Sequence, residues 1–122
     1  MAIRGIDHVQ LAMPAGGEDV ARGFYTGLLG IPETPKPPNL AKNGGCWFED
    51  GPVKLHIGRD PDFHPATRAH PALVVTEVRA LAAKLEAAGV AIHEDPPIEG
   101  MDRFYVFDPF GNRVEFLEYL DP

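Results

Sequence analysis

The sequence has one cysteine and no long hydrophobic run. A single cysteine, Cys46, cannot form a disulfide within the chain, and the first residues, MAIRGIDHVQLAMP, lack the long apolar core of a secretory signal. No apolar run approaches the ~18 residues that a membrane-spanning helix needs. We therefore expect a cytoplasmic protein that does not enter a membrane.

Basic residues are also scarce. The chain carries 11 Lys and Arg against 18 Asp and Glu, a formal net charge of −7, and it has no visible basic stripe. Nucleic-acid binding depends mainly on clustered positive charge, so the composition argues against a nucleic-acid partner. At 122 residues, with 44% hydrophobic and 24% charged, the chain can bury a core of its own. We predict one domain over residues 1–122.

The first half of the chain reads as a strand, a helix and then a hairpin. Alternation in IDHVQLAM predicts a strand over residues 6–13, with His8 and Gln10 on its more polar face. Helical spacing of apolar residues predicts an amphipathic helix over residues 18–29, closed by Gly30. Proline, asparagine and glycine in residues 32–45 argue against a helix there and permit a short edge strand or an irregular segment. Two more strands are expected at residues 47–48 and 53–57.

The second half repeats this order after a polar connector at residues 58–69. A strand is expected at residues 70–75 and an amphipathic helix at 78–88, followed by a short strand at 90–93. The last part, RFYVFDPFGNRVEFLEYL, predicts a hairpin because two aromatic and β-branched runs flank the turn residues 108–112.

The two halves superpose as an internal repeat. A shift of about 59 positions aligns the helix ends and the hairpins, and about three more positions align the first strands. The aligned pairs are Gly30 with Gly89, Phe48 with Phe107, His56 with Glu115 and His8 with His70. We therefore predict an α+β fold of two βαβββ modules, at about residues 1–60 and 69–120, that form a curved mixed sheet around a central cavity with the helices on the outer face.

Three histidines and one glutamate occupy paired repeat positions on the face away from the predicted helices. Each residue alone is more often a surface or satisfied side chain, but four such groups at matched positions favour a metal site. Imidazole and carboxylate ligands suit Fe, Mn, Zn, Ni or Co ions. We therefore predict a divalent metal held by His8, His56, His70 and Glu115. His64 and His93 have no repeat partner and are expected at the surface.

These residues resemble the vicinal oxygen chelate superfamily, which includes glyoxalase I, extradiol dioxygenases, and fosfomycin and bleomycin resistance proteins. The resemblance is carried by IDHVQLAM, FYTGLLGI, AHPALVV and FYVFDPFGNRVEFLE. It covers essentially the whole chain and places His8, His70 and Glu115 where the family has metal ligands. His56 stands where glyoxalase I has a glutamate ligand, which argues against glyoxalase I activity itself.

The resemblance implies a metal-dependent lyase, isomerase or dioxygenase that acts on a small molecule with two adjacent oxygens. It implies that Glu115 also acts as a base and that Tyr105 faces the cavity as a hydrogen-bond donor. Gln10 and Arg68 are further candidate substrate contacts, Arg68 for an anionic group. The alternative is a ligand-binding or resistance-type protein of the same fold that performs no chemistry. A homodimer is expected in either case.

Overall fold

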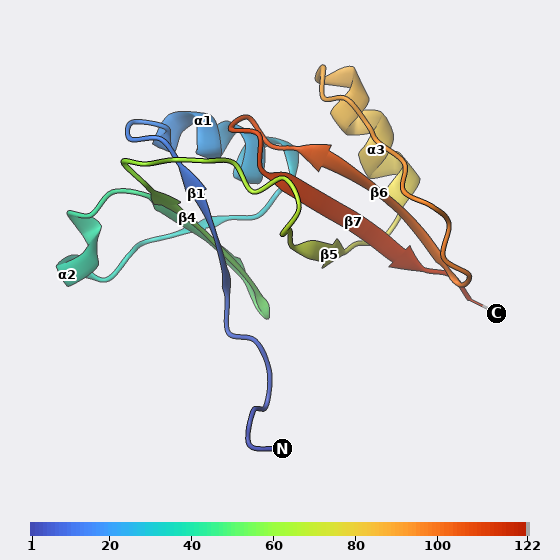
Figure 1. The fold of residues 1–122 in the computed structure, drawn as a ribbon, viewed down its shortest axis with the longest axis horizontal. Coiled ribbons are helices and arrows are strands. Elements are labelled where there is room, and N and C mark those ends of the chain that lie inside the picture. Colours follow the sequence, from blue (N-terminus) through green and yellow to red (C-terminus); the bar gives the residue numbers. More distant parts are fainter. Residues whose placement is uncertain (122) are drawn as a thin grey trace. The chain divides into compact units, whose positions relative to one another are not determined.

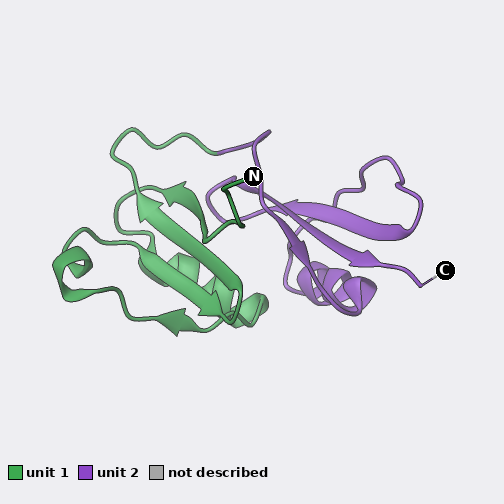
Figure 2. Ribbon diagram, turned by 90° about the horizontal axis from the view of Figure 1, so that it is seen from below, with its two compact units in different colours: residues 1–65 green, residues 66–122 purple. Residues whose placement is uncertain are grey.

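The computed structural model describes residues 1–121, which fold into two compact units. Unit 1 is Met1–Pro65, and unit 2 begins at Ala66 (Figure 2). The boundary lies inside the polar connector predicted at residues 58–69. None of the helices in residues 1–121 has the length and apolar character needed to span a membrane.

Unit 1 is a four-stranded sheet with strand order β1-β4-β3-β2. Its neighbouring strands β1 and β4 are labelled in Figure 1. Strands β1 and β4 are parallel, whereas β4 with β3 and β3 with β2 are antiparallel. The elements in chain order are β1 (Val9–Met13), α1 (Glu18–Arg22), the π-helical turn η1 (Gly23–Leu28), β2 (Glu33–Thr34), α2 (Pro38–Ala41), β3 (Cys46–Asp50) and β4 (Val53–Arg59).

The core of unit 1 lies between this sheet and the α1–η1 segment. Met13, Phe48 and Leu55 project from alternate strand positions and are fully buried, and the Tyr25 ring of η1 stacks on Phe48 at 5.3 Å between centroids. Because strand side chains alternate, the residues between them, such as His56, project from the opposite face of the sheet.

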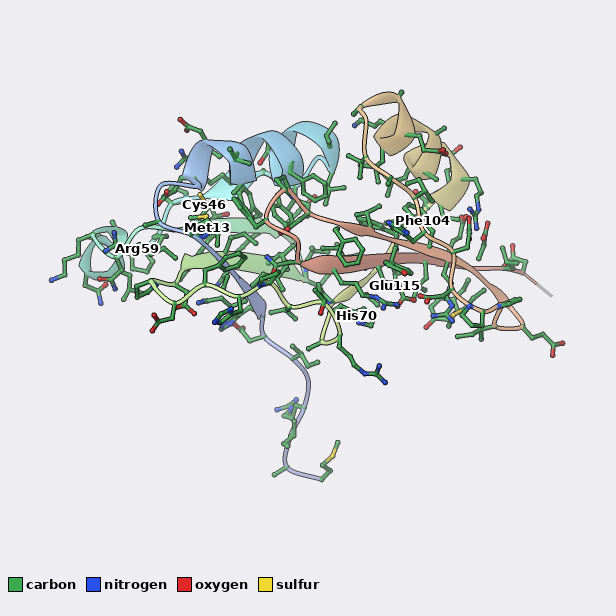
Figure 3. The ribbon with its side chains drawn as sticks, turned by 45° about the horizontal axis from the view of Figure 1, so that its top comes forward. Met13, Cys46, Arg59, His70, Phe104 and Glu115 are labelled. Carbon is green, nitrogen blue, oxygen red and sulfur yellow. The ribbon has the colours of Figure 1, made fainter. Side chains whose placement is uncertain are left out.

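Unit 2 is a three-stranded sheet, order β5-β7-β6, with one helix on one face. The elements are β5 (Ala72–Val74), α3 (Val78–Ala87), β6 (Met101–Phe107) and β7 (Arg113–Tyr119). The predicted apolar stripe of α3 is buried at Val78, Ala82 and Leu85. Phe104 projects toward α3, whereas His70 and Glu115 lie on the other side of the sheet (Figure 3).

The strand registers reproduce the internal repeat. Gln10 pairs with His56 across the parallel strands β1 and β4, and Ala72 pairs with Glu115 across β5 and β7. Gln10 and Ala72, in the first strands of the two modules, are 62 positions apart, and His56 and Glu115, in the last strands, are 59 apart. Both offsets agree with the alignment of the two halves of the sequence. The α+β class with two βαβββ modules is thereby confirmed.

The third strand of each module departs from the predicted alignment by one residue. His56 pairs with Trp47, and Glu115 pairs with Tyr105, so Trp47 corresponds to Tyr105 and the offset of this strand is 58 rather than 59. The turn of the second hairpin, residues 108–112, is longer than the turn of the first, where Asp50 pairs with Val53.

Four local predictions were wrong in detail. The strand predicted from residue 6 begins at Val9, and the strand predicted at 90–93 is reduced to one bridge between His93 and Tyr105. The helix predicted at 18–29 changes from α to π at Gly23, where Leu29 N–H donates to the carbonyl of Phe24. Residues 32–45 do contain a helix, the four-residue α2, because Pro38 occupies its first turn, where no backbone donor is required.

Candidate functional site

Glu115 and His70 form the closest pair of candidate ligands in unit 2. Glu115 projects from the middle of β7, and its side chain is only 8% exposed. His70 lies two residues before β5, and its Nε2 is 2.9 Å from Glu115 Oε1. The simplest expectation for a carboxylate on an antiparallel strand, a position in solvent, is therefore wrong for Glu115.

The hydrogen bonds of His70 define which ring nitrogen carries the proton. Its Nδ1 is 2.8 Å from the carbonyl of Arg68, and since a carbonyl only accepts, Nδ1–H is the donor. The Nε2 of a neutral ring is then an acceptor, and it faces a carboxylate oxygen, which is also an acceptor. Two acceptors at this distance require a positive charge between them, either a proton or a metal ion.

The distance between these two atoms, 2.9 Å, is that of a hydrogen bond. An imidazole nitrogen and a carboxylate oxygen are also the kinds of ligand that a divalent transition-metal ion takes. The second oxygen of Glu115, Oε2, is 3.3 Å from Nη1 of Arg103, so the two oxygens have different partners.

Arg103 and Arg113 surround this pair with positive charge. Arg103 Nη1 is also 3.5 Å from Asp95, and Nη2 of Arg113 lies 3.0 Å from the same carboxylate. The guanidinium of Arg113 stands 3.8 Å above the ring centroid of Tyr105. The Nε atoms of both arginines are buried without a hydrogen-bond partner among residues 1–121. The carboxylate of Glu115 is therefore held by a partly buried network of charges.

His8 and His56 form the corresponding pair in unit 1. Their rings stack with centroids 4.4 Å apart, and the ring of Trp47 also stacks on His56, with centroids 4.2 Å apart. His56 is buried, whereas the side chain of His8 is 43% exposed. Each module therefore brings together its own two candidate ligands, one from before the first strand and one from the last strand.

Each of the three histidines has an oxygen partner on at least one ring nitrogen. His8 Nδ1 is 2.9 Å from Asp7, His56 Nε2 is 2.7 Å from Glu49, and His70 Nδ1 is 2.8 Å from the carbonyl of Arg68. An oxygen acceptor on one ring nitrogen fixes the tautomer and leaves the other nitrogen as the acceptor, which is the usual arrangement of metal-binding histidines. The hydrogen bond to His8, with a smaller contribution from Lys54, also lowers the pKa of Asp7.

These residues fit a divalent ion by their chemistry. The three imidazoles are oriented by oxygen partners, and Glu115 supplies a buried carboxylate, a donor set that suits Fe, Mn, Zn, Ni or Co. Within residues 1–121, no three His, Cys, Asp or Glu side chains lie close enough to hold an ion together. The structure thus presents two pairs of candidate ligands, one in each unit.

The other predicted site residues occupy several environments. Tyr105 lies directly opposite Glu115 on β6, and its ring also stacks on His93 at 5.1 Å. Gln10 lies beside His56 on β1, with its side chain across Gly58 of β4. Arg68 is exposed and contributes its carbonyl to His70. His64 is exposed, as expected, but the prediction for His93 was wrong, because its ring is half-buried against Tyr105.

Sequence reasoning missed Asp7, Glu49, Asp95 and Arg103. Glu49 lies two positions after Trp47, the residue opposite His56, and so shares its sheet face with His56. Arg103 lies two positions before Tyr105, the residue opposite Glu115, and so shares its sheet face with Glu115. Period-two alternation from Trp47 and from Tyr105 would have placed both on those faces once the hairpin registers were known. Asp95 belongs to the loop before β6, and no sequence pattern indicates its position.

Comparison with known proteins identifies the family. The profile of the Glyoxalase/Bleomycin resistance protein/Dioxygenase superfamily matches residues 5–116, so this chain belongs to that superfamily. Comparison with curated proteins gave no match.

Solved structures with this fold are numerous. A protein from Bacillus anthracis, described as of the glyoxalase family, is 47% identical, with a TM-score of 0.93 over 98% of each chain. A lactoylglutathione lyase from Agrobacterium tumefaciens is 20% identical, with a TM-score of 0.75 over 97% of this chain and 96% of that one. A fosfomycin resistance protein from Listeria monocytogenes is 18% identical, with a TM-score of 0.75 over 95% and 93%. The last two similarities show the fold alone.

Proposed function

We propose that this protein is a divalent-metal-dependent enzyme, a lyase, isomerase or dioxygenase, that acts on a small molecule presenting two adjacent oxygens. The observation that supports this most is the contact between His70 Nε2 and the buried carboxylate of Glu115, whose Oε1 is 2.9 Å away. The Nδ1–H of His70 is committed to a backbone carbonyl, so the facing atoms are available to a cation.

His70 and Glu115 would hold an ion, for which Fe, Mn, Zn, Ni and Co are the candidates, and His8 and His56 are proposed as further metal ligands. When bound, such an ion acts as a Lewis acid toward a substrate oxygen on which negative charge develops. The role of the protein is to fix the ligand orientation, and the oxygen partners of the three histidines do this before the ion arrives.

The remaining roles belong to side chains around Glu115. Glu115 is proposed as the general base as well as a metal ligand, and Arg103, whose Nη1 is 3.3 Å from Glu115 Oε2, would keep the carboxylate in its orientation. Tyr105, directly opposite on β6, is proposed as a hydrogen-bond donor to the substrate. Gln10 and Arg68 are proposed as further substrate contacts.

Metal content measured after loading with each of the five ions tests this proposal. We expect close to one ion per chain in the wild type, and loss of most of it in His70→Ala and Glu115→Gln. His8→Ala and His56→Ala should weaken binding as well. His64→Ala is the matched control, since His64 is an exposed histidine outside both pairs, and it should bind as the wild type does.

Two outcomes would contradict the proposal. One is the absence of metal from the wild type under every loading, and the other is full metal content in both His70→Ala and Glu115→Gln. Either result would favour the alternative, a binding or resistance-type protein of the same fold in which the histidines line a ligand site without holding an ion.

A homodimer in the cytoplasm is proposed for this protein. Its support is an N-terminal segment with apolar side chains in solvent, among them Ile3 and Ile6, which are 72% and 83% exposed. Apolar groups this exposed on a single chain favour association with another surface. Sedimentation velocity should give twice the chain mass at micromolar concentration, and a monomer at all concentrations would refute the dimer.

A further inference from the structure

A pocket of about 230 Å³ lies in unit 1, and its lining includes Trp47, whose ring stacks on His56. Its lining comes from β1, β3, β4 and the segment around α2, and includes Gln10, Lys36, Leu40, Asn43, Trp47 and Arg59. The volume is below the 300–1,000 Å³ range common for drug-sized ligands, so the pocket fits a small molecule or one end of a larger one.

The charge of the pocket is opposite to that of the protein. Lys36 and Arg59 line it, and none of the described lining residues is Asp or Glu, although the chain has a net charge of −7. Neither cation forms an ion pair with a carboxylate among residues 1–121. Two cations that line one pocket of an acidic protein favour an anionic ligand.

Local contacts hold both cations at the pocket. Lys36 donates to the carbonyl of Gly44, and its ammonium group retains further donors. A Cβ on Gly44 would lie 3.1 Å from Cδ of Arg59, so the turn passes close beside the arginine stem. Glu18 Oε2 accepts the N–H of Gly45, which lowers the pKa of Glu18, and the charge of Arg59 adds a smaller effect in the same direction without an ion pair between the two. Figure 3 shows Arg59 beside α2.

The other lining residues define the shape of the ligand. Trp47 offers an aromatic wall, and Leu40 adds apolar surface. Gln10 lies over Gly58, where an added Cβ would be 2.5 Å from Gln10 Nε2, so the absence of a side chain at 58 permits this position of the amide. The amides of Gln10 and Asn43 can donate to an oxygen anion, while Trp47 can stack on a flat group.

We propose that this pocket binds a small flat molecule through its anionic group, a carboxylate or a phosphate. Lys36 and Arg59 bind the anion, and Trp47 packs against the flat part. Trp47 also stacks on His56, so a ligand in this pocket lies against the residue next to a proposed metal ligand. The binding of an anion in this pocket does not depend on the proposed function. The identification of that anion as the substrate of the enzyme does rest on the proposed function.

Binding can be measured on metal-free protein by NMR, because the single tryptophan gives a single indole N–H signal. Benzoate and phenyl phosphate are the anionic probes, and benzamide is the neutral analogue of benzoate. We expect both anions to shift the Trp47 signal and to bind at least about tenfold more tightly than benzamide, since each charge-assisted hydrogen bond is worth that factor. The tighter of the two anions identifies carboxylate or phosphate as the preferred group.

Variants locate the site. Arg59→Gln and Lys36→Gln should each weaken benzoate binding by about tenfold. Lys42→Gln is the matched control, because it removes the same charge just after α2 from a residue outside the pocket lining, and it should change affinity less than about twofold at moderate salt. Gly58→Ala, which displaces the flexible end of Gln10, should weaken benzoate and benzamide alike.

The proposal would be overturned if benzamide bound as tightly as benzoate, if Lys42→Gln weakened binding as much as Arg59→Gln, or if no probe shifted the Trp47 signal. His70→Ala separates this proposal from the metal proposal, because it should lose metal and still bind benzoate like the wild type. Should a variant fail to fold, the comparison of benzoate with benzamide on the wild type decides the matter alone.

Discussion

Replacing Arg103 by methionine should destabilise the protein by about 2 kcal/mol, because this side chain neutralises two partly buried carboxylates. Its guanidinium contacts Glu115 at 3.3 Å, Asp95 at 3.5 Å and the carbonyl of Pro96 at 2.7 Å. The side chains of Arg103 and of the two acids are 17%, 8% and 16% exposed, so solvent screens these contacts only partly. Methionine keeps the apolar stem and removes the charge.

The magnitude follows from two opposing effects. At 3.3 Å and an effective dielectric constant of ~20, the gross attraction of one such pair is roughly 5 kcal/mol. Desolvation of the partners offsets much of this, and mutational values for hydrogen bonds to charged groups are ~1.5–3 kcal/mol. Because Arg103 Nε is buried without a partner among residues 1–121, part of the desolvation cost is not recovered, and we expect a value toward the lower end.

Guanidinium chloride unfolding of metal-free protein measures this effect. Arg79→Met is the matched control, since Arg79 also joins two carboxylates of unit 2, Glu94 and Asp102, but its side chain is 49% exposed. Exposed ion pairs contribute ~0–1 kcal/mol each, so the control should lose less than Arg103→Met. If the two variants lost the same free energy, the inference that a buried charge network supports Glu115 would be refuted.

Two further stability predictions concern other parts of the fold. Glu118→Ala should cost about 1 kcal/mol in thermal or chemical unfolding, because Glu118 of β7 accepts the N–H groups of Glu77 and Val78 at the start of α3. The exposed helix residue Glu86 supplies the control, and an equal loss in Glu86→Ala would contradict this capping role. Burial raises the pKa of the Cys46 thiol to about 11, so the native protein binds a proton that the unfolded chain releases near pH 9. Stability should therefore fall between pH 9 and 11 more in the wild type than in Cys46→Ala, and parallel pH profiles would refute it.

The order of elements could be predicted from the sequence because the patterns that specify it are local. Alternation indicated β1 and β7, helical spacing indicated α3, and the residues 108–112 indicated the hairpin turn. The repeat offsets of 62 and 59 also agree with the registers that pair Gln10 with His56 and Ala72 with Glu115. Each of these features depends on residues within one element or on a comparison of the two halves.

The details that escaped prediction depend on backbone geometry or on long side chains. The apolar spacing of residues 18–29 suits an α-helix and a π-helix alike, so the change at Gly23 has no signal in the pattern. The ion pairs of Glu49 and Arg103 depend on hairpin register, and one extra residue in the second hairpin changes which side chains lie opposite. The sequence indicated His70 and Glu115 by position, but only the structure shows their orientation.

Anomalous diffraction from a crystal of metal-loaded protein tests the central claim most directly. We expect one strong peak at the absorption edge of the loaded ion, within ~2.0–2.3 Å of both His70 Nε2 and Glu115 Oε1. A peak bound elsewhere, or no peak with His70 and Glu115 still 2.9 Å apart, would contradict it.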